Sequence, residues 1–223
     1  MRYFGVASVT IAAIGLVSVL SGTATAATAA TEQDAAQSCG AIELSGSLPA
    51  PPEGMSVQQT VTIGEDCEPE LGPVEYVPVE SPATDLTSTA AASRQIRSWS
   101  EMYDCCNIRM TGLYSTADWN TEDGRIVTAT TTATQEWNRE PWNAGWSLES
   151  ASDTQDCAED CSVVNHDAVA DFSYQGIFDP TGNRYANTHH SSIQLNADAT
   201  ADCTFDVQLK NTFIGWNWQR GCE

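Results

Sequence analysis

The sequence is poor in basic residues. Of its 223 residues, 9 are Lys or Arg and 30 are Asp or Glu, which gives a net charge of −21, and Lys210 is the only lysine. Binding to nucleic acid and to anionic membrane surfaces depends on Lys and Arg. We therefore expect no nucleic-acid partner and no membrane partner for the mature chain.

Local signatures of catalysis and of cofactor binding are also missing. The chain has no G-x-S-x-G, no H-E-x-x-H and no Gly-rich phosphate loop. Only three histidines occur, and His189 and His190 are neighbours on an expected strand, where they would face opposite sides. We expect no metal, no other cofactor and no catalytic residue. A triad assembled in space around His166 is the enzymatic alternative.

No long apolar run follows the first 26 residues. Those residues combine Arg2, an apolar stretch over 6–20 and the small-residue sequence Ala24-Thr25-Ala26. This arrangement is typical of a cleaved signal peptide, and the apolar stretch is shorter than the ~20 residues of a membrane span. The sequence thus predicts a secreted, extracellular protein with a signal peptide over residues 1–26.

All eight cysteines lie beyond that segment. An even number of cysteines in an exported chain is typical of a disulfide framework. We therefore assign all eight to disulfides: Cys39, Cys67, Cys105, Cys106, Cys157, Cys161, Cys203 and Cys222.

The cysteine spacing favours one pairing scheme. Cys157 and Cys161 are four positions apart and can pair across a tight loop. Cys39 and Cys67 can also pair with each other, across a longer loop. Cys105 and Cys106 are adjacent, and side chains of neighbouring residues in an extended segment face opposite sides. We expect each of these two to bond to one of the C-terminal cysteines, Cys203 and Cys222. The alternative is a vicinal Cys105–Cys106 ring, which requires strained geometry.

Residues 27–97 form an acidic, Pro-rich N-terminal segment, which we expect to be partly ordered. It carries eleven acidic residues between positions 27 and 93 and no basic one. One strand is expected over 56–63, where apolar and polar residues alternate. Two interpretations remain open: the segment docks one or two strands on the main domain, or it is a linker or pro-segment.

Residues 98–223 show a β pattern. Apolar residues alternate with polar ones in several runs, and residues 125–137 are dense in Thr, Val and Ala, which favours strand over helix. Turn-rich loops are expected over 115–124, 138–145 and 152–160. The pattern predicts an all-β fold, an antiparallel β-sandwich or barrel-like domain with disulfide staples. Its expected strands lie at 108–112, 125–137, 146–150, 168–178, 184–195 and 203–209.

Tryptophan is abundant, with seven residues in the chain. Trp119 and Trp142 fall in expected loops, and Asn143 and Trp146 lie beside the second of these. Loops on a rigid sandwich often carry binding residues, and exposed rings beside polar groups suit sugar faces. We select Trp119, Trp142, Asn143 and Trp146 as candidate binding residues. The alternative is that these rings cap the ends of the sandwich.

Three functions are compatible with these features. The first is a non-catalytic extracellular binding module for polysaccharide or cell-envelope material, favoured by the loop tryptophans. The second is a secreted inhibitor or other factor that binds a secreted protein, for which a disulfide scaffold with long loops is suited. The third is a secreted hydrolase of unknown substrate.

Overall fold

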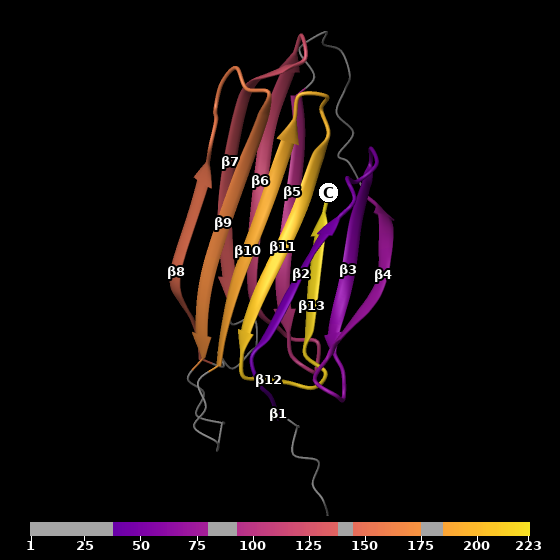
Figure 1. Cartoon of the computed structure of the whole chain (residues 1–223), viewed down its shortest axis with the longest axis vertical. Helices are drawn as coiled ribbons and strands as arrows, with labels where there is room; N and C mark the ends of the chain where they lie inside the picture. The colour runs from indigo at the N-terminus through magenta and orange to yellow at the C-terminus, as the bar shows by residue number, and fades with distance from the viewer. Residues whose placement is uncertain (1–37, 80–92, 138–144, 175–184) are drawn as a thin grey trace, which may run out of the picture. The chain divides into compact units, whose positions relative to one another are not determined.

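Two large antiparallel sheets and one two-stranded pair form the fold. The computed structural model describes residues 38–79, 93–137, 145–174 and 185–223, which all belong to the unit Ala36–Glu223. All regular structure in these residues is β-strand, and Figure 1 shows the five-stranded sheet in front of a six-stranded sheet. No helix among them is long and apolar enough to cross a membrane.

The five-stranded sheet has the order β2-β11-β10-β9-β8. Strands β8 to β11 form a meander in which each strand pairs with the next one in the sequence. The N-terminal strand β2 then adds to the free edge of β11. The bounds are β2 (Ile42–Leu48), β8 (Trp146–Gln155), β9 (Val163–Tyr174), β10 (Tyr185–Asn196) and β11 (Ala201–Lys210).

The six-stranded sheet has the order β4-β3-β13-β5-β6-β7. The C-terminal strand β13 lies between an N-terminal hairpin, β3–β4, and the meander β5–β6–β7. Strands β1 (Ser38–Cys39) and β12 (Thr212–Phe213) form a separate short pair. The bounds in the six-stranded sheet are β3 (Met55–Ile63), β4 (Pro69–Pro78), β5 (Ser93–Tyr103), β6 (Arg109–Glu122), β7 (Arg125–Trp137) and β13 (Asn217–Cys222).

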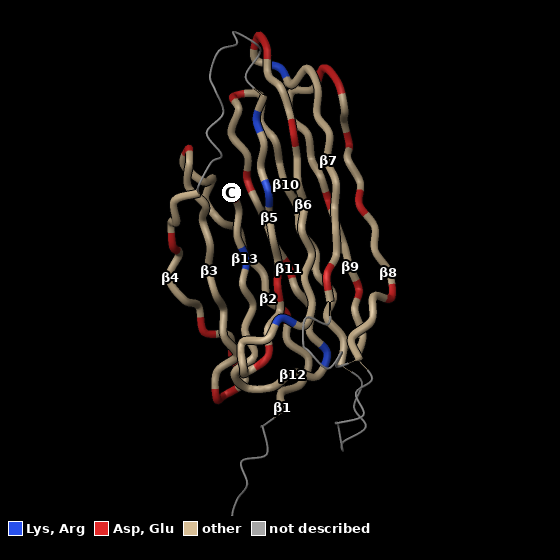
Figure 2. The backbone as a smooth tube through the Cα atoms, turned by 180° about the vertical axis from the view of Figure 1, so that it is seen from behind, with Lys and Arg blue, Asp and Glu red and all other residues tan. Residues whose placement is uncertain are grey.

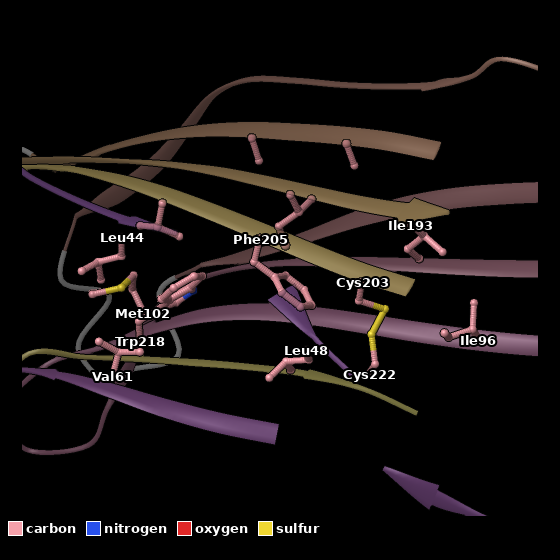
Figure 3. Packing of buried hydrophobic residues seen from close by; sticks show 14 of the residues in the cluster. Leu44, Leu48, Val61, Ile96, Met102, Ile193, Cys203, Phe205, Trp218 and Cys222 are labelled. Atoms are coloured by element: carbon pink, nitrogen blue, oxygen red, sulfur yellow. A yellow bond between two sulfur atoms is a disulfide. The ribbon is translucent and has the colours of Figure 1, made fainter. Parts of the chain in front are cut away.

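The core lies between the two sheets. Along β11 every second residue is buried, as strand alternation requires, and Phe205 faces the six-stranded sheet. Figure 3 shows Phe205 and Leu44 on one side of the core and Trp218, Met102 and Val61 on the other. The sheets are also joined along one edge, where Ile126 of β7 exchanges backbone hydrogen bonds with Cys161 at 2.8 and 2.9 Å.

The expected fold class is confirmed in its sandwich form, and the strands do not close into a barrel. The Thr-rich strand expected over 125–137 has these same bounds in β7. The strands expected over 56–63 and 203–209 correspond to β3 and β11. The alternation of apolar and polar residues predicted these strands, because one face of each strand is buried and the other faces water.

The loop expected over 115–124 is largely wrong, whereas the loop expected over 152–160 is wrong up to residue 155 and confirmed over 156–160. Strand β6 continues to Glu122, and β8 extends to Gln155. In β6 the polar Asp118 and Asn120 lie on the outer face while Ala117 and Trp119 are buried, so the alternation holds. These polar side chains resemble turn signals in the sequence, but they lie on the solvent face of a strand. The loop expected over 138–145 lies almost entirely outside the described residues.

The N-terminal segment contributes strands to both sheets. Strand β2 pairs with β11 across seven residues, and β3 pairs with β13 across six. A domain boundary near residue 98 therefore does not separate the two parts, because strands from both sides of it share the same two sheets. The signal peptide expected over 1–26 lies outside the described residues.

Three disulfides are present, and two of them are the expected local pairs, Cys39–Cys67 and Cys157–Cys161. The third joins Cys203 of β11 to Cys222 of β13 and links the two sheets, as Figure 3 shows. Bonding of Cys105 and Cys106 to these two residues is therefore wrong: Cys105 and Cys106 are free and exposed. They lie in the turn after β5, where alternation across a strand does not apply.

Candidate functional site

Two polar clusters are built from the same two strands, β5 and β6. Alternate residues of a strand point to opposite faces, so Ser100 and Thr111 point into the sandwich while Glu101 and Tyr114 lie on its outer face. Figure 2 brings this outer face of the six-stranded sheet to the front. The two clusters differ in access to solvent, and this difference decides which of them can bind a ligand.

The inner cluster is centred on His189 of β10. Its Nδ1 lies 2.9 Å from Ser100 Oγ, and its Nε2 lies 2.9 Å from Thr111 Oγ1. Trp218 Nε1 donates to Ser100 Oγ at 2.9 Å, and Asn187 Nδ2 donates to Thr111 Oγ1 at 3.0 Å. These bonds connect the two sheets through buried groups that would otherwise lack partners.

Burial makes the inner cluster structural. It lowers the pKa of His189 to about 3, so that the imidazole is neutral at physiological pH. Ser100 and His189 have the separation of a nucleophile and its base. Both residues are 0 % exposed, however, and no substrate reaches them in this conformation.

The inner cluster is extended by Arg220, which is the one buried cation among the described residues. Arg220 of β13 lies with its guanidinium carbon 4.6 Å from the centre of the Trp218 ring, and its Nη2 donates to Gln59 Oε1 at 2.6 Å. Burial lowers the pKa of Arg220. A side chain on Gly46 of β2 would collide with this guanidinium, so the glycine provides the space that Arg220 occupies.

The outer cluster is charged. Glu101 accepts hydrogen bonds from Tyr103 Oη at 2.8 Å, from Arg109 Nη1 at 2.5 Å and from Tyr114 Oη. Arg109 also contacts Tyr114 Oη and pairs with Glu136 through Nη2. The side chains of Glu101 and Arg109 are 12 % and 17 % exposed, so this face is partly covered but reaches solvent.

Both tyrosines of the outer cluster are hydrogen-bond donors at physiological pH. Partial burial, and then the hydrogen bond to Glu101, raise the pKa of Tyr103 to about 12. The same two causes raise the pKa of Tyr114 still further above its usual range. The cluster therefore holds neutral phenols next to ion-paired carboxylates.

Two aromatic rings lie on this outer face above glycines. A Cβ placed on Gly221 would lie 1.9 Å from Trp99 Cζ2 and 2.4 Å from each of its two ring neighbours, Cε2 and Cη2. Such short, equal distances to both neighbours place that point above the ring face, so the Trp99 ring lies across Gly221. Likewise, the hydroxyl end of Tyr114 lies over Gly112. Aromatic side chains commonly cover glycines in sheets in this way.

The rings and the polar groups form adjacent rows. Trp99 of β5 lies directly opposite Tyr114 of β6 on one side and Gly221 of β13 on the other. In the next row Glu101 lies opposite Gln219. We call Trp99, Tyr103, Tyr114, Glu101 and Arg109 the outer-face site. It combines partly exposed ring faces with hydrogen-bond donors and acceptors about 5 Å apart from strand to strand.

The candidate tryptophans selected from the sequence lie elsewhere. Trp119 is 3 % exposed within β6, and Trp146 is 4 % exposed at the start of β8. The ring of Trp146 lies 5.4 Å from that of Tyr174 and 6.4 Å from that of Trp216, in an aromatic group that closes one end of the core. Trp142 and Asn143 lie outside the described residues.

His166 and the acidic residues between β8 and β9 do not form a catalytic or metal-binding site in the described residues. His166 is 0 % exposed within β9, and burial lowers its pKa. Asp156 accepts hydrogen bonds from the backbone and side chain of Asn165 at 2.8 and 2.7 Å, which lower its pKa. No group of three metal-ligating side chains occurs in the part of the chain that the structure describes.

Sequence reasoning missed the outer-face site, although a signal for it was present. Trp99, Glu101 and Tyr103 follow one another at every second position, which places them on one strand face. The pairing of that face with Arg109 and Tyr114 depends on the register between β5 and β6, which the sequence alone does not give. Comparison with known proteins gives no match to a family model, to a curated protein or to a solved structure.

Proposed function

We propose that this protein is a secreted, non-catalytic binding module for polysaccharide or cell-envelope carbohydrate, and that it binds the sugar on the outer-face site. The observation that carries the proposal is the pair of partly exposed rings, Trp99 and Tyr114, on neighbouring strands over glycines. A ring lying on the sheet offers its other face to a flat ligand, and a pyranose ring has such an apolar face.

The polar groups beside the rings support a hydroxyl-rich ligand. Tyr103 and Gln219 add a phenol and an amide next to the Glu101 carboxylate. Sugar hydroxyls donate and accept hydrogen bonds, and pockets for polar ligands combine aromatic surface with a few fixed polar groups. Three disulfides are compatible with an extracellular location, as is the signal peptide expected over 1–26.

The carboxylates are better suited to binding than to hydrolysis. Glu101 and Glu136 both contact the same guanidinium, that of Arg109. A glycosidase requires one carboxylic acid that donates a proton and a second carboxylate as base or nucleophile. Because both carboxylates here contact the same cation, we assign them the role of orienting Arg109 and the tyrosines.

A protein partner is the second candidate, and one observation favours it. The edge strand β4 exposes several large apolar side chains, with Leu71 68 % and Tyr76 48 % exposed. Contiguous exposed apolar residues often mark a protein-binding surface. This surface is distinct from the outer-face site, so variants in each separate the two candidates.

The test is retention of the secreted, oxidised protein on insoluble polysaccharides and cell-wall preparations, followed by release with the matching soluble sugar. Trp99→Ala should weaken binding at least tenfold, and Trp99→Phe should retain most of it. Trp137→Ala is the matched control, because Trp137 is a 39 % exposed tryptophan on β7 outside the site. Retention on no polymer contradicts the proposal, as does binding that Trp137→Ala abolishes and Trp99→Ala leaves intact.

A further inference from the structure

Two free cysteines lie side by side in the turn between β5 and β6. Cys105 and Cys106 are exposed and take part in no disulfide, whereas the other six cysteines form three bonds. Their Sγ atoms are 3.7 Å apart. The outer-face site does not include them, so an inference about them is independent of the proposed function.

The turn that carries the two thiols is well fixed. Asp104 Oδ1 accepts hydrogen bonds from the backbone N–H groups of Cys106 and Ile108, both at 2.8 Å. Asn107 has a φ of 61°, which closes the turn in the left-handed region. On the other side Cys105 packs against Gly215, where a Cβ would lie 3.4 Å from Cys105 Cβ. The backbone of the turn is therefore fixed, and the observed rotamers of the two cysteines place their Sγ atoms 3.7 Å apart.

A disulfide between these two thiols is unfavourable because the two cysteines are adjacent in the chain. Consecutive Cα atoms across a trans peptide are about 3.8 Å apart, whereas Cα atoms joined by a disulfide are usually about 4.4–6.8 Å apart. The six remaining cysteines are occupied with one another. The pair therefore remains a dithiol that a single external atom can bridge.

The separation of the two sulfurs matches that of two ligands to one tetrahedral metal ion. With a zinc–sulfur distance of about 2.3 Å and a tetrahedral angle of about 109°, two thiolates lie about 3.8 Å apart. The observed 3.7 Å needs almost no rearrangement. We propose that Cys105 and Cys106 form a bidentate site for a thiophilic divalent cation, with zinc and cadmium as the best-suited ions.

The site is open on its solvent side. No third His, Cys, Asp or Glu joins the pair among the described residues, so water or another exogenous ligand completes the coordination. Binding forms two metal–sulfur bonds, and each thiol releases its proton to solvent with no change in oxidation state.

Cadmium chloride titration of the full oxidised protein tests this site. We expect an ultraviolet charge-transfer band, release of about two protons per bound ion, and protection of two thiols from a thiol reagent. Cys105→Ser and Cys106→Ser should each weaken binding at least tenfold, and the double variant should lose the band. Circular dichroism checks the fold of each variant.

Three results would overturn the assignment. The first is the absence of the band in the wild-type protein, and the second is an unchanged band in the double variant. The third is a count of no free thiols in freshly purified protein, because this would show that the pair is already consumed by oxidation. Sugar binding measured on the same double variant should be unchanged, which separates this site from the outer-face site.

Discussion

The inner and outer polar clusters show how one pair of strands sustains two different kinds of chemistry. Ser100 and Glu101 are neighbours in the chain, yet the first bonds a neutral, buried imidazole and the second an ion-paired guanidinium at the surface. The inner cluster excludes solvent and links the two sheets. The outer cluster reaches solvent, so its polar groups are open to a ligand on that face.

The difference follows from the cost of burying charge. An ionised group loses its hydration in the interior, so burial there lowers the pKa of His189 to about 3. On the outer face partial burial also acts to lower the pKa of Arg109, but the hydrogen bond to Glu101 and the nearby negative charges outweigh it, so the pKa of Arg109 is raised. The inner cluster should therefore contribute stability, whereas the outer cluster should contribute specificity. Four experiments test this division of roles.

The largest effect should come from truncating an inner tryptophan. Trp218→Ala removes a ring that is 1 % exposed and leaves Ser100 without its donor, so we expect a loss of about 3–5 kcal/mol in unfolding free energy. Trp99→Ala, on the outer face, should cost about 1 kcal/mol. Urea unfolding of both variants measures the contrast. Similar losses for the two would contradict the division of roles.

Acid should weaken the inner cluster. The pKa of His189 is about 3 in the folded protein and about 6.5 in the unfolded chain. Below pH 6.5 the unfolded chain therefore binds a proton that the folded protein does not, and stability falls by up to about 1.4 kcal/mol per pH unit until about pH 3.

Urea unfolding at pH 7.5, 6 and 5 measures this slope. His189→Gln should unfold with a shallower pH dependence than the wild type over this range. His166 is also buried with a lowered pKa, and it contributes the same trend to both proteins, so the difference isolates His189. Equal slopes would show that His189 is not held neutral by burial.

Salt should affect the outer cluster only. Arg109→Gln removes the pairs with Glu101 and Glu136, and we expect a loss of about 1 kcal/mol at low ionic strength. Glu136 is 40 % exposed, whereas Glu101 is only 12 % exposed. In 1 M NaCl, where the Debye length is about 3 Å, the pair with Glu136 should be screened most, so the difference in unfolding free energy between variant and wild type should narrow. A gap that stays constant would indicate that packing of the Arg109 side chain, and not its charge, stabilises this face.

The smallest effect concerns the outer tyrosines at alkaline pH. The pKa of Tyr103 is raised to about 12 in the folded protein, compared with about 10 in the unfolded chain. Its contribution to stability is thus present below pH 10 and is lost as the pH rises through 12. Spectrophotometric titration should show this late phenol ionisation. Tyr103→Phe should remove one such step, and an unchanged titration curve would contradict the assignment.

Local pattern predicted the strands but not their partners. The bounds of β7 and the alternation in β11 followed from residue type, because each has one buried and one solvated face. Trp119 was misplaced because the Asn and Asp beside it suggested a loop, whereas these residues cover the outer face of β6. The pairing of β6 with β5 and β7 is what shows that this segment is a strand and not a loop.

The cysteines illustrate the same limit. Cys157 and Cys161 are four positions apart, so chain connectivity alone brought them together. Cys203 and Cys222 lie on strands of different sheets, and their bond depends on how those sheets face each other. The adjacent Cys105 and Cys106 were expected to staple a strand, but they lie in a turn that presents both to solvent.

The acidic charge, the all-β class and the faces of the most regular strands were predictable from the sequence, because they depend on composition and on a period of two residues. The place of β13 between β3 and β5, the contact of Trp99 with Gly221 and that of Glu101 with Arg109 became visible only in the folded structure. Those pairings join residues up to 165 positions apart in the chain, which is the separation of Val57 and Cys222. They depend on strand order and register, which are set by the packing of the whole sandwich.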